Sequence, residues 1–108
     1  YYDSVVYDVH VGEGLRVPSA TRDVFEYASH LLLLKRIDVV GFRGGEIDII
    51  EVKPDAGISA VGQVFCYEAL YRRDFKVTGV IQKVIVTDHL WPDHQFLFEL
   101  FGIVVFVV

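Results

Sequence analysis

The stretch that decides the fold is IDVVGFRGGEIDIIEVK, residues 37–53, in which two apolar runs flank a pair of glycines. Gly44 and Gly45 can adopt the positive φ angles of a two-residue turn, so the stretch predicts a β-hairpin. With these two residues as the loop, the pairing of all later residues follows. The register predicts that Asp38 lies directly opposite Glu51.

Facing residues of an antiparallel pair point to the same side, with Cβ atoms roughly 4.5–5.5 Å apart. Asp38 and Glu51 would therefore present two carboxylates side by side, which is unfavourable unless something compensates the charge. Oxygen ligands at this separation suit Mg²⁺ or Mn²⁺. Lys53 is on the same face of the strand and could position a water or neutralise developing negative charge.

An ordinary solvated polar patch at the end of a hairpin is the alternative reading of these carboxylates. Both faces of the hairpin are mostly apolar, however, so idle buried carboxylates would be costly. The register places Val40, Phe42 and Ile49 on the carboxylate face and Ile37, Val39, Ile50 and Val52 on the opposite face. The sequence leaves both readings open at this point.

The remaining elements follow from periodicity and from glycine and proline positions. Strands are expected over Ser4 to Val11, Ile37 to Phe42, Glu46 to Lys53, Ile81 to Thr87 and Ile103 to Val108; helices over Ser19 to about Leu33, Ser59 to about Arg73 and Pro92 to about Phe101. The order β-α-β-β-α-β-α-β predicts one α/β domain with a mixed sheet and flanking helices. The last two strands should be parallel, and the last should be buried on both faces.

Composition restricts the class of protein. The chain has 108 residues, of which 53% are hydrophobic, so it is not expected to be disordered. Its longest non-polar run has nine residues, Leu100 to Val108, too few for a membrane-spanning helix. One cysteine and the absence of a basic, apolar leader favour the cytoplasm, or the host cytoplasm if the protein is viral.

Asp38, then twelve residues, then Glu51-Val52-Lys53 resembles the signature of the PD-(D/E)XK nuclease superfamily, with Ile37 at the usual proline position. The order of elements is similar to the restriction-endonuclease-like core of that family. The segment from Arg36 to Phe75 also resembles small uncharacterised proteins of phages and prophages.

The resemblance implies Mg²⁺- or Mn²⁺-dependent hydrolysis of a nucleic-acid phosphodiester, with DNA as the expected substrate. Asp38 and Glu51 would hold the metal together with the carbonyl of Val52. In many members a glutamate on the first helix completes the site, and Glu26 is the candidate here. Lys53 would orient the attacking water or stabilise the pentavalent state.

The helix after the hairpin carries further candidates. Gln63 and Tyr67 lie one turn apart and are similar to the Q-x-x-x-Y element of the branch that includes the phage lambda exonuclease. The resemblance implies that they support the site or touch the substrate. Arg72 and Arg73 lie in a stretch of net charge +2 that could contact phosphates, although cations near a helix C-terminus need no such role.

Other polar residues have simpler interpretations. Asp48 falls on the opposite hairpin face and is interpreted as structural or surface, and Cys66 is interpreted as a core residue. His89 and His94, near Asp88 and Asp93, could suggest zinc, but loop polarity and helix N-terminal acids explain them more simply.

The net charge of −5 argues against a simple nucleic-acid-binding module. Residues 38–55 alone carry −3, which is better interpreted as the location of a cation. A catalytically inactive nuclease-fold module of a viral or mobile-element complex remains the alternative function. A mean hydropathy of +0.40 favours a homodimer or larger oligomer, and a symmetric dimer would suit structure-selective cleavage of DNA junctions.

Overall fold

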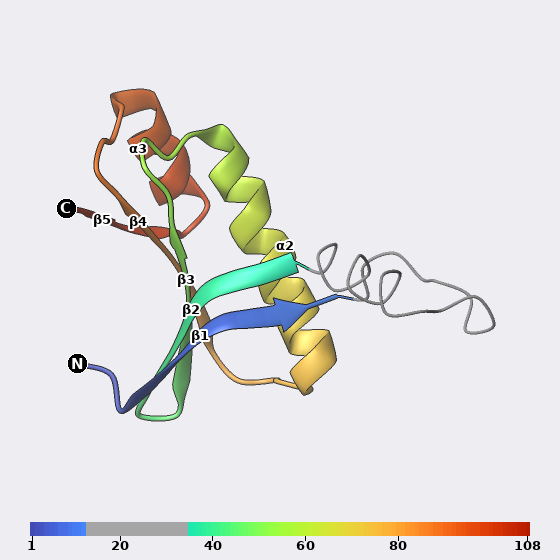
Figure 1. Ribbon diagram of the computed structural model, residues 1–108. Helices are drawn as coiled ribbons and strands as arrows, with labels where there is room; N and C mark the ends of the chain where they lie inside the picture. Colours follow the sequence, from blue (N-terminus) through green and yellow to red (C-terminus); the bar gives the residue numbers. More distant parts are fainter. Residues whose placement is uncertain (13–34) are drawn as a thin grey trace, which may run out of the picture.

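The computed structural model describes residues 1–12 and 35–108, which form one five-stranded mixed sheet with two helices (Figure 1). The elements are β1 (Ser4–Val11), β2 (Lys35–Arg43), β3 (Glu46–Val52), α2 (Ile58–Phe75), β4 (Ile81–Thr87), α3 (Pro92–Leu100) and β5 (Val104–Val107). The α/β class with a mixed sheet is therefore confirmed. The helix expected over Ser19 to about Leu33, and Glu26 with it, lies outside the described residues.

Strand order in the sheet follows the chain, from β1 to β5. β1, β2 and β3 are antiparallel, whereas β3, β4 and β5 run parallel to one another. The predicted hairpin register is confirmed from Val39–Ile50 to Arg43–Glu46. Both turn glycines have positive φ angles, +53° and +84°, as a two-residue turn of this kind requires.

Helix α2 covers one face of the sheet and α3 packs beside it. The buried side chains of α2 are Ala60, Val64 and Tyr71, which share one side of the helix. Phe98 of α3 is 1% exposed and joins Val64 and Ile85 in one buried cluster. The helices therefore lie on the same face, over Ile85 of β4. No helix in the described ranges is both long and apolar enough to cross a membrane.

The C-terminal strand differs from its expectation in burial. β4 and β5 are parallel as predicted, but β5 was expected to be buried on both faces, and that is wrong. Phe106 and Val107 are 52% and 55% exposed. β5 has only four residues and pairs only with β4 in the described part of the chain, so it is an edge strand with little to cover it.

A buried polar contact closes the face of the sheet opposite the helices. Asp48 is 2% exposed and accepts a hydrogen bond of 2.8 Å from the phenol of Tyr2. Its partner across the ladder, Gly41, leaves room for the Tyr2 ring, since a Cβ at that position would lie 2.6 Å from ring carbons. Burial and the Asp48 carboxylate raise the pKa of Tyr2 to about 12, so the phenol remains a donor. Asp48 is therefore structural and not a surface residue.

The Tyr2→Phe substitution should lower the free energy of unfolding by about 1–2 kcal/mol, because it removes a donor from a buried carboxylate. Tyr1→Phe is the matched control, since the Tyr1 side chain is 88% exposed. Urea unfolding followed by circular dichroism would compare the two variants. Equal stability of both variants would contradict a structural role for the contact.

Candidate active site

The ladder between β2 and β3 ends at Val39–Ile50, one step before the predicted pairing of Asp38 with Glu51. The Val52 amide instead donates to Oδ2 of Asp38 at 2.9 Å. On its other side β3 remains paired with β4, since the Lys53 amide donates to the carbonyl of Val86. A side chain thus replaces a backbone acceptor at the point where β2 and β3 separate.

Strand β2 also changes its packing at this point. Ile37 was expected on the face opposite Val40 and Ile49, but all three belong to one buried cluster, so that expectation is wrong. The pairing of β1 with β2 is interrupted at the same level, between Tyr7–Val39 and Val9–Ile37. Asp8, which lies at the interruption, has a φ of +52°, outside the extended conformation. Regular alternation is therefore lost around Asp38.

Glu51 is a buried carboxylate with an unfavourable environment for its charge. It is 8% exposed, and its Oε2 atom has no hydrogen-bond partner among the described residues. Burial, followed by the neighbouring Asp38 carboxylate, raises the pKa of Glu51 to about 7, against the opposing effect of Lys53. The group thus exchanges its proton near neutral pH, and a cation beside it would be strongly favoured.

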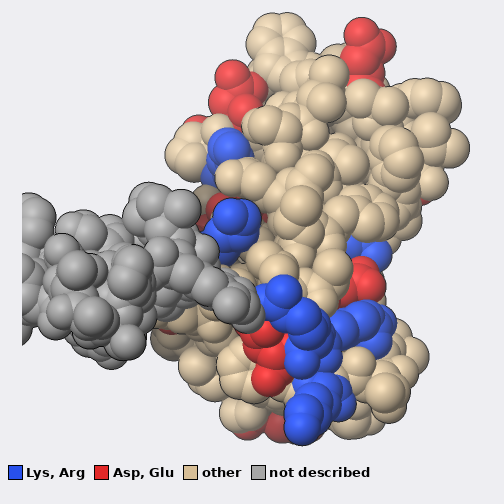
Figure 2. Space-filling model, turned by 90° about the vertical axis from the view of Figure 1, so that its right-hand side faces the viewer, with Lys and Arg blue, Asp and Glu red and all other residues tan. Residues whose placement is uncertain are grey.

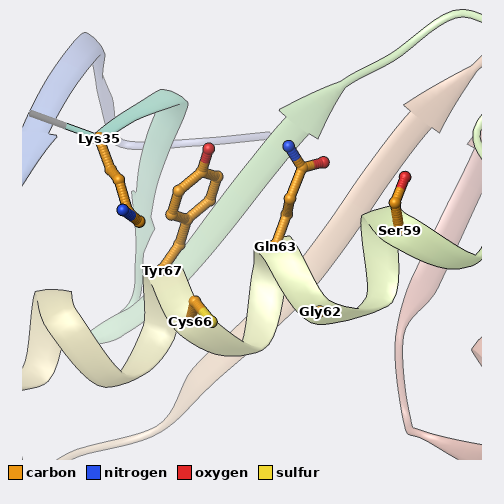
Figure 3. Close-up of a pocket in the computed structure, with 6 residues that line it drawn as sticks. All are labelled: Lys35, Ser59, Gly62, Gln63, Cys66 and Tyr67. Carbon is orange, nitrogen blue, oxygen red and sulfur yellow. The ribbon is translucent and has the colours of Figure 1, made fainter. Parts of the chain in front are cut away.

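Helix α2 brings two further side chains to the carboxylates. Lys53 donates from Nζ to Oε1 of Gln63 at 3.0 Å. Burial, followed by the charges of Glu51 and Asp38, raises the pKa of Tyr67. Figure 3 shows Gln63 and Tyr67 projecting from the same side of the helix, as their spacing predicts. The structure assembles these five residues from β2, β3 and α2; their chemical roles remain predictions.

The two arginines lie apart from this group, near the C-terminal end of α2. Arg72 contacts Glu68 at 3.2 Å and donates to the carbonyl of Gly79, and Arg73 contacts Asp74 at 2.9 Å. Figure 2 shows Lys and Arg side chains gathered in the lower part of the view, with acidic side chains among them. Along the helix axis Arg72 lies about 13 Å from Gln63 and about 7.5 Å from Tyr67. Contact of either arginine with substrate remains a prediction.

A metal-binding set is incomplete in the described ranges. Within residues 1–12 and 35–108, no group of three His, Cys, Asp or Glu side chains is placed to hold a metal ion. Asp38 and Glu51 supply two carboxylates, and the unpartnered Oε2 atom of Glu51 fits a cation. The predicted third carboxylate, Glu26, lies outside the described residues.

The other candidates fall elsewhere. Cys66 is exposed, so its interpretation as a core residue is wrong; the buried side of α2 is formed by Ala60, Val64 and Tyr71. Residues near the two histidines organise a loop. The Trp91 indole donates to Asp55 at 2.9 Å, Asp88 accepts from the Asp55 amide, and His89 packs edge-on against Trp91.

A pocket along α2 was not anticipated from the sequence. Its volume is about 420 Å³, and it is lined by Lys35, Ser59, Gly62, Gln63, Cys66 and Tyr67 (Figure 3). The four-residue spacing of Ser59, Gln63 and Tyr67 is a signal that could have revealed one wall. Lys35 gave no such signal, because it precedes the expected start of its strand.

Comparison with known proteins gives structural likenesses only. No family model matches the chain, and no curated protein matches it. A repair endonuclease from Pyrococcus abyssi has 23% identity and a TM-score of 0.57 over 68% of this chain and 32% of its own. A protein of unknown function has 18% identity and a TM-score of 0.62 over 94% of this chain and 47% of its own.

These likenesses establish the fold. The chain has a mixed α/β fold similar to that of the repair endonuclease. It spans less than half the length of either solved structure, so their activities as whole proteins do not transfer directly.

The Glu51→Gln substitution should stabilise the metal-free protein at pH 8. An acid whose pKa rises from 4.5 to about 7 on folding stabilises the native state only while protonated, so its contribution is lost as pH rises through that window. The variant should gain up to about 3 kcal/mol over wild type at pH 8 and little at pH 4.5.

Urea unfolding in EDTA at both pH values would measure this difference. Glu46→Gln is the matched control, because Glu46 is a partly exposed acid on the same strand. If the difference between Glu51→Gln and wild type did not depend on pH, the buried-charge account of Glu51 would be wrong.

Proposed function

We propose that the chain is a metal-dependent nuclease domain that hydrolyses DNA phosphodiester bonds at Asp38, Glu51 and Lys53. The observation that carries the proposal is the buried Glu51 carboxylate, which lies beside Asp38 and has an oxygen without a partner in the described part of the chain. Its place on a fold shared with a repair endonuclease adds support.

The residues present fit Mg²⁺ or Mn²⁺, because both ions prefer carboxylate oxygens. Asp38 and Glu51 would hold the ion, with the carbonyl of Val52 and Glu26 as the further ligands that the family resemblance implies. When bound, the ion would supply Lewis-acid activation of water and phosphate.

Lys53, positioned by Gln63, would stabilise negative charge at the reacting phosphate. The Gln63 amide oxygen accepts a hydrogen bond from Lys53 and so limits the positions of the ammonium group. From there Lys53 can orient the attacking water or stabilise negative charge that develops on the phosphate oxygens. As a ligand Glu51 would be ionised, because a bound cation favours the charged carboxylate that burial disfavours in the metal-free site.

A catalytically inactive binding or assembly module is the second candidate. The observation that favours it is that two carboxylates, and not three, come together within residues 1–12 and 35–108. Metal affinity separates the candidates, because an inactive module has no need to bind Mn²⁺. Calorimetric titration of the wild-type protein with Mn²⁺ would test this directly.

Cleavage assays on single-stranded, nicked, branched and duplex DNA should show activity that requires Mg²⁺ or Mn²⁺. Asp38→Ala and Lys53→Ala should each lose at least about 100-fold, the size expected when a group that stabilises transition-state charge is removed. Asp38→Ala should also weaken Mn²⁺ binding measured by calorimetry, because it removes a ligand.

Glu46→Ala serves as the matched control, since it removes an acid from the same hairpin at a position away from the site. Circular dichroism would establish that each variant is folded. Absence of cleavage on all four DNA forms with both metals, or full activity in Lys53→Ala, would overturn the proposal.

A further inference from the structure

The pocket on α2 shares two lining residues with the candidate active site. Two of its lining residues, Gln63 and Tyr67, are also the two α2 side chains that approach the hairpin carboxylates and Lys53. Figure 3 shows Tyr67, Gln63 and Ser59 in a row along one edge of the helix, with Lys35 reaching from β2 toward the Tyr67 end. A molecule bound in this pocket would therefore lie next to the candidate active site.

The lining of the pocket differs in character from the carboxylate site. Among the lining residues that the structure describes, none is acidic and Lys35 carries the one charge. The wall is mostly apolar and includes the Tyr67 ring and the Cys66 thiol. At Gly62 an added Cβ would meet nothing within 4 Å, so there is room for a larger side chain at this position.

These features suit an occupant that is flat and weakly polar but joined to an anion. A nucleotide has this chemistry, with a base that stacks on aromatic rings and a phosphate that pairs with a lysine. A volume of about 420 Å³ falls within the range of roughly 300–1,000 Å³ that small-molecule pockets span.

We propose that this pocket receives an unpaired base of the strand being cut, while Lys35 contacts a flanking phosphate. The proposal rests on the proposed nuclease function and narrows its substrate class. Bases in a continuous duplex are stacked, so withdrawing one is unfavourable, and least so where the base is already unpaired. The preferred substrate is therefore DNA with an unpaired nucleotide beside the scissile phosphate, as in a single strand or a flap.

Protection of Cys66 from alkylation tests occupancy without any cleavage. Cys66 is the single cysteine of the chain and is exposed, so mass spectrometry of the N-ethylmaleimide adduct reports on this pocket alone. In EDTA, a saturating thymidine oligonucleotide should slow alkylation about tenfold, the effect of one base–aromatic stack. A blunt duplex and an oligonucleotide of abasic sites should leave the rate unchanged. Equal protection by the abasic chain would mean that only phosphates bind, and would overturn the proposal.

Gly62→Leu tests the same pocket by filling it. The leucine enters open space, and replacing glycine within a helix should not destabilise the fold. Affinity for a fluorescent thymidine oligonucleotide, measured by anisotropy, should fall about tenfold. The control is Ala69→Leu, an exposed position two turns along α2 that lines no part of this pocket, and its affinity should equal that of wild type.

The two proposals fail in different ways. A wild-type protein that cleaves no DNA contradicts the nuclease, whereas the alkylation and anisotropy measurements need no cleavage. A wild type that cleaves DNA, together with a Gly62→Leu variant that binds and cuts single strands as well as wild type, would overturn the base pocket alone.

Discussion

The juxtaposition of two like-charged carboxylates, at the point where two strands of a hairpin separate, organises this part of the molecule. Asp38 accepts a hydrogen bond from the Val52 amide, and Glu51 lies beside it with one oxygen unpaired in the described part of the chain. Burying a carboxylate without a compensating charge is costly, and the pKa of Glu51 near 7 expresses that cost. Carboxylates with strongly shifted pKa values are concentrated at the functional sites of proteins.

The two faces of the sheet around this carboxylate pair differ in what they contact. On the helix-covered face, α2 packs through Ala60 and Val64, and its Gln63 side chain accepts a hydrogen bond from Lys53. On the opposite face, Asp48 is not part of the candidate site, and its carboxylate accepts a hydrogen bond from the Tyr2 phenol. Asp48 and Glu51, three residues apart on β3, therefore have different environments: Asp48 is hydrogen-bonded to Tyr2, whereas Glu51 lies beside Asp38.

Much of this could be predicted from local sequence. The two turn glycines set the hairpin register, since that turn admits few conformations, and the register placed Asp38 and Glu51 near each other. The four-residue spacing of Gln63 and Tyr67 placed both on one helix face. The strands Ser4–Val11 and Ile81–Thr87 were predicted with the bounds that the structure has.

The errors have a common physical origin. The face expected for Ile37 and the burial expected for Cys66 and β5 each depend on neighbours distant in the chain. Residue type and periodicity indicate whether a side chain tolerates burial, but not which element arrives to cover it. The edge position of β5 and the irregular conformation at Asp8 arise from pairing between strands, which no local pattern encodes.

The sequence by itself therefore determined the hairpin, its register and the identity of the residues at its end, because turn geometry and the two-residue period of a strand act locally. Only the tertiary structure decided that the ladder stops one step early, that Glu51 becomes buried beside Asp38, and that a pocket opens along α2. Those features depend on how β3 continues along β4 and how α2 packs across the sheet, and such contacts form between segments far apart in the chain.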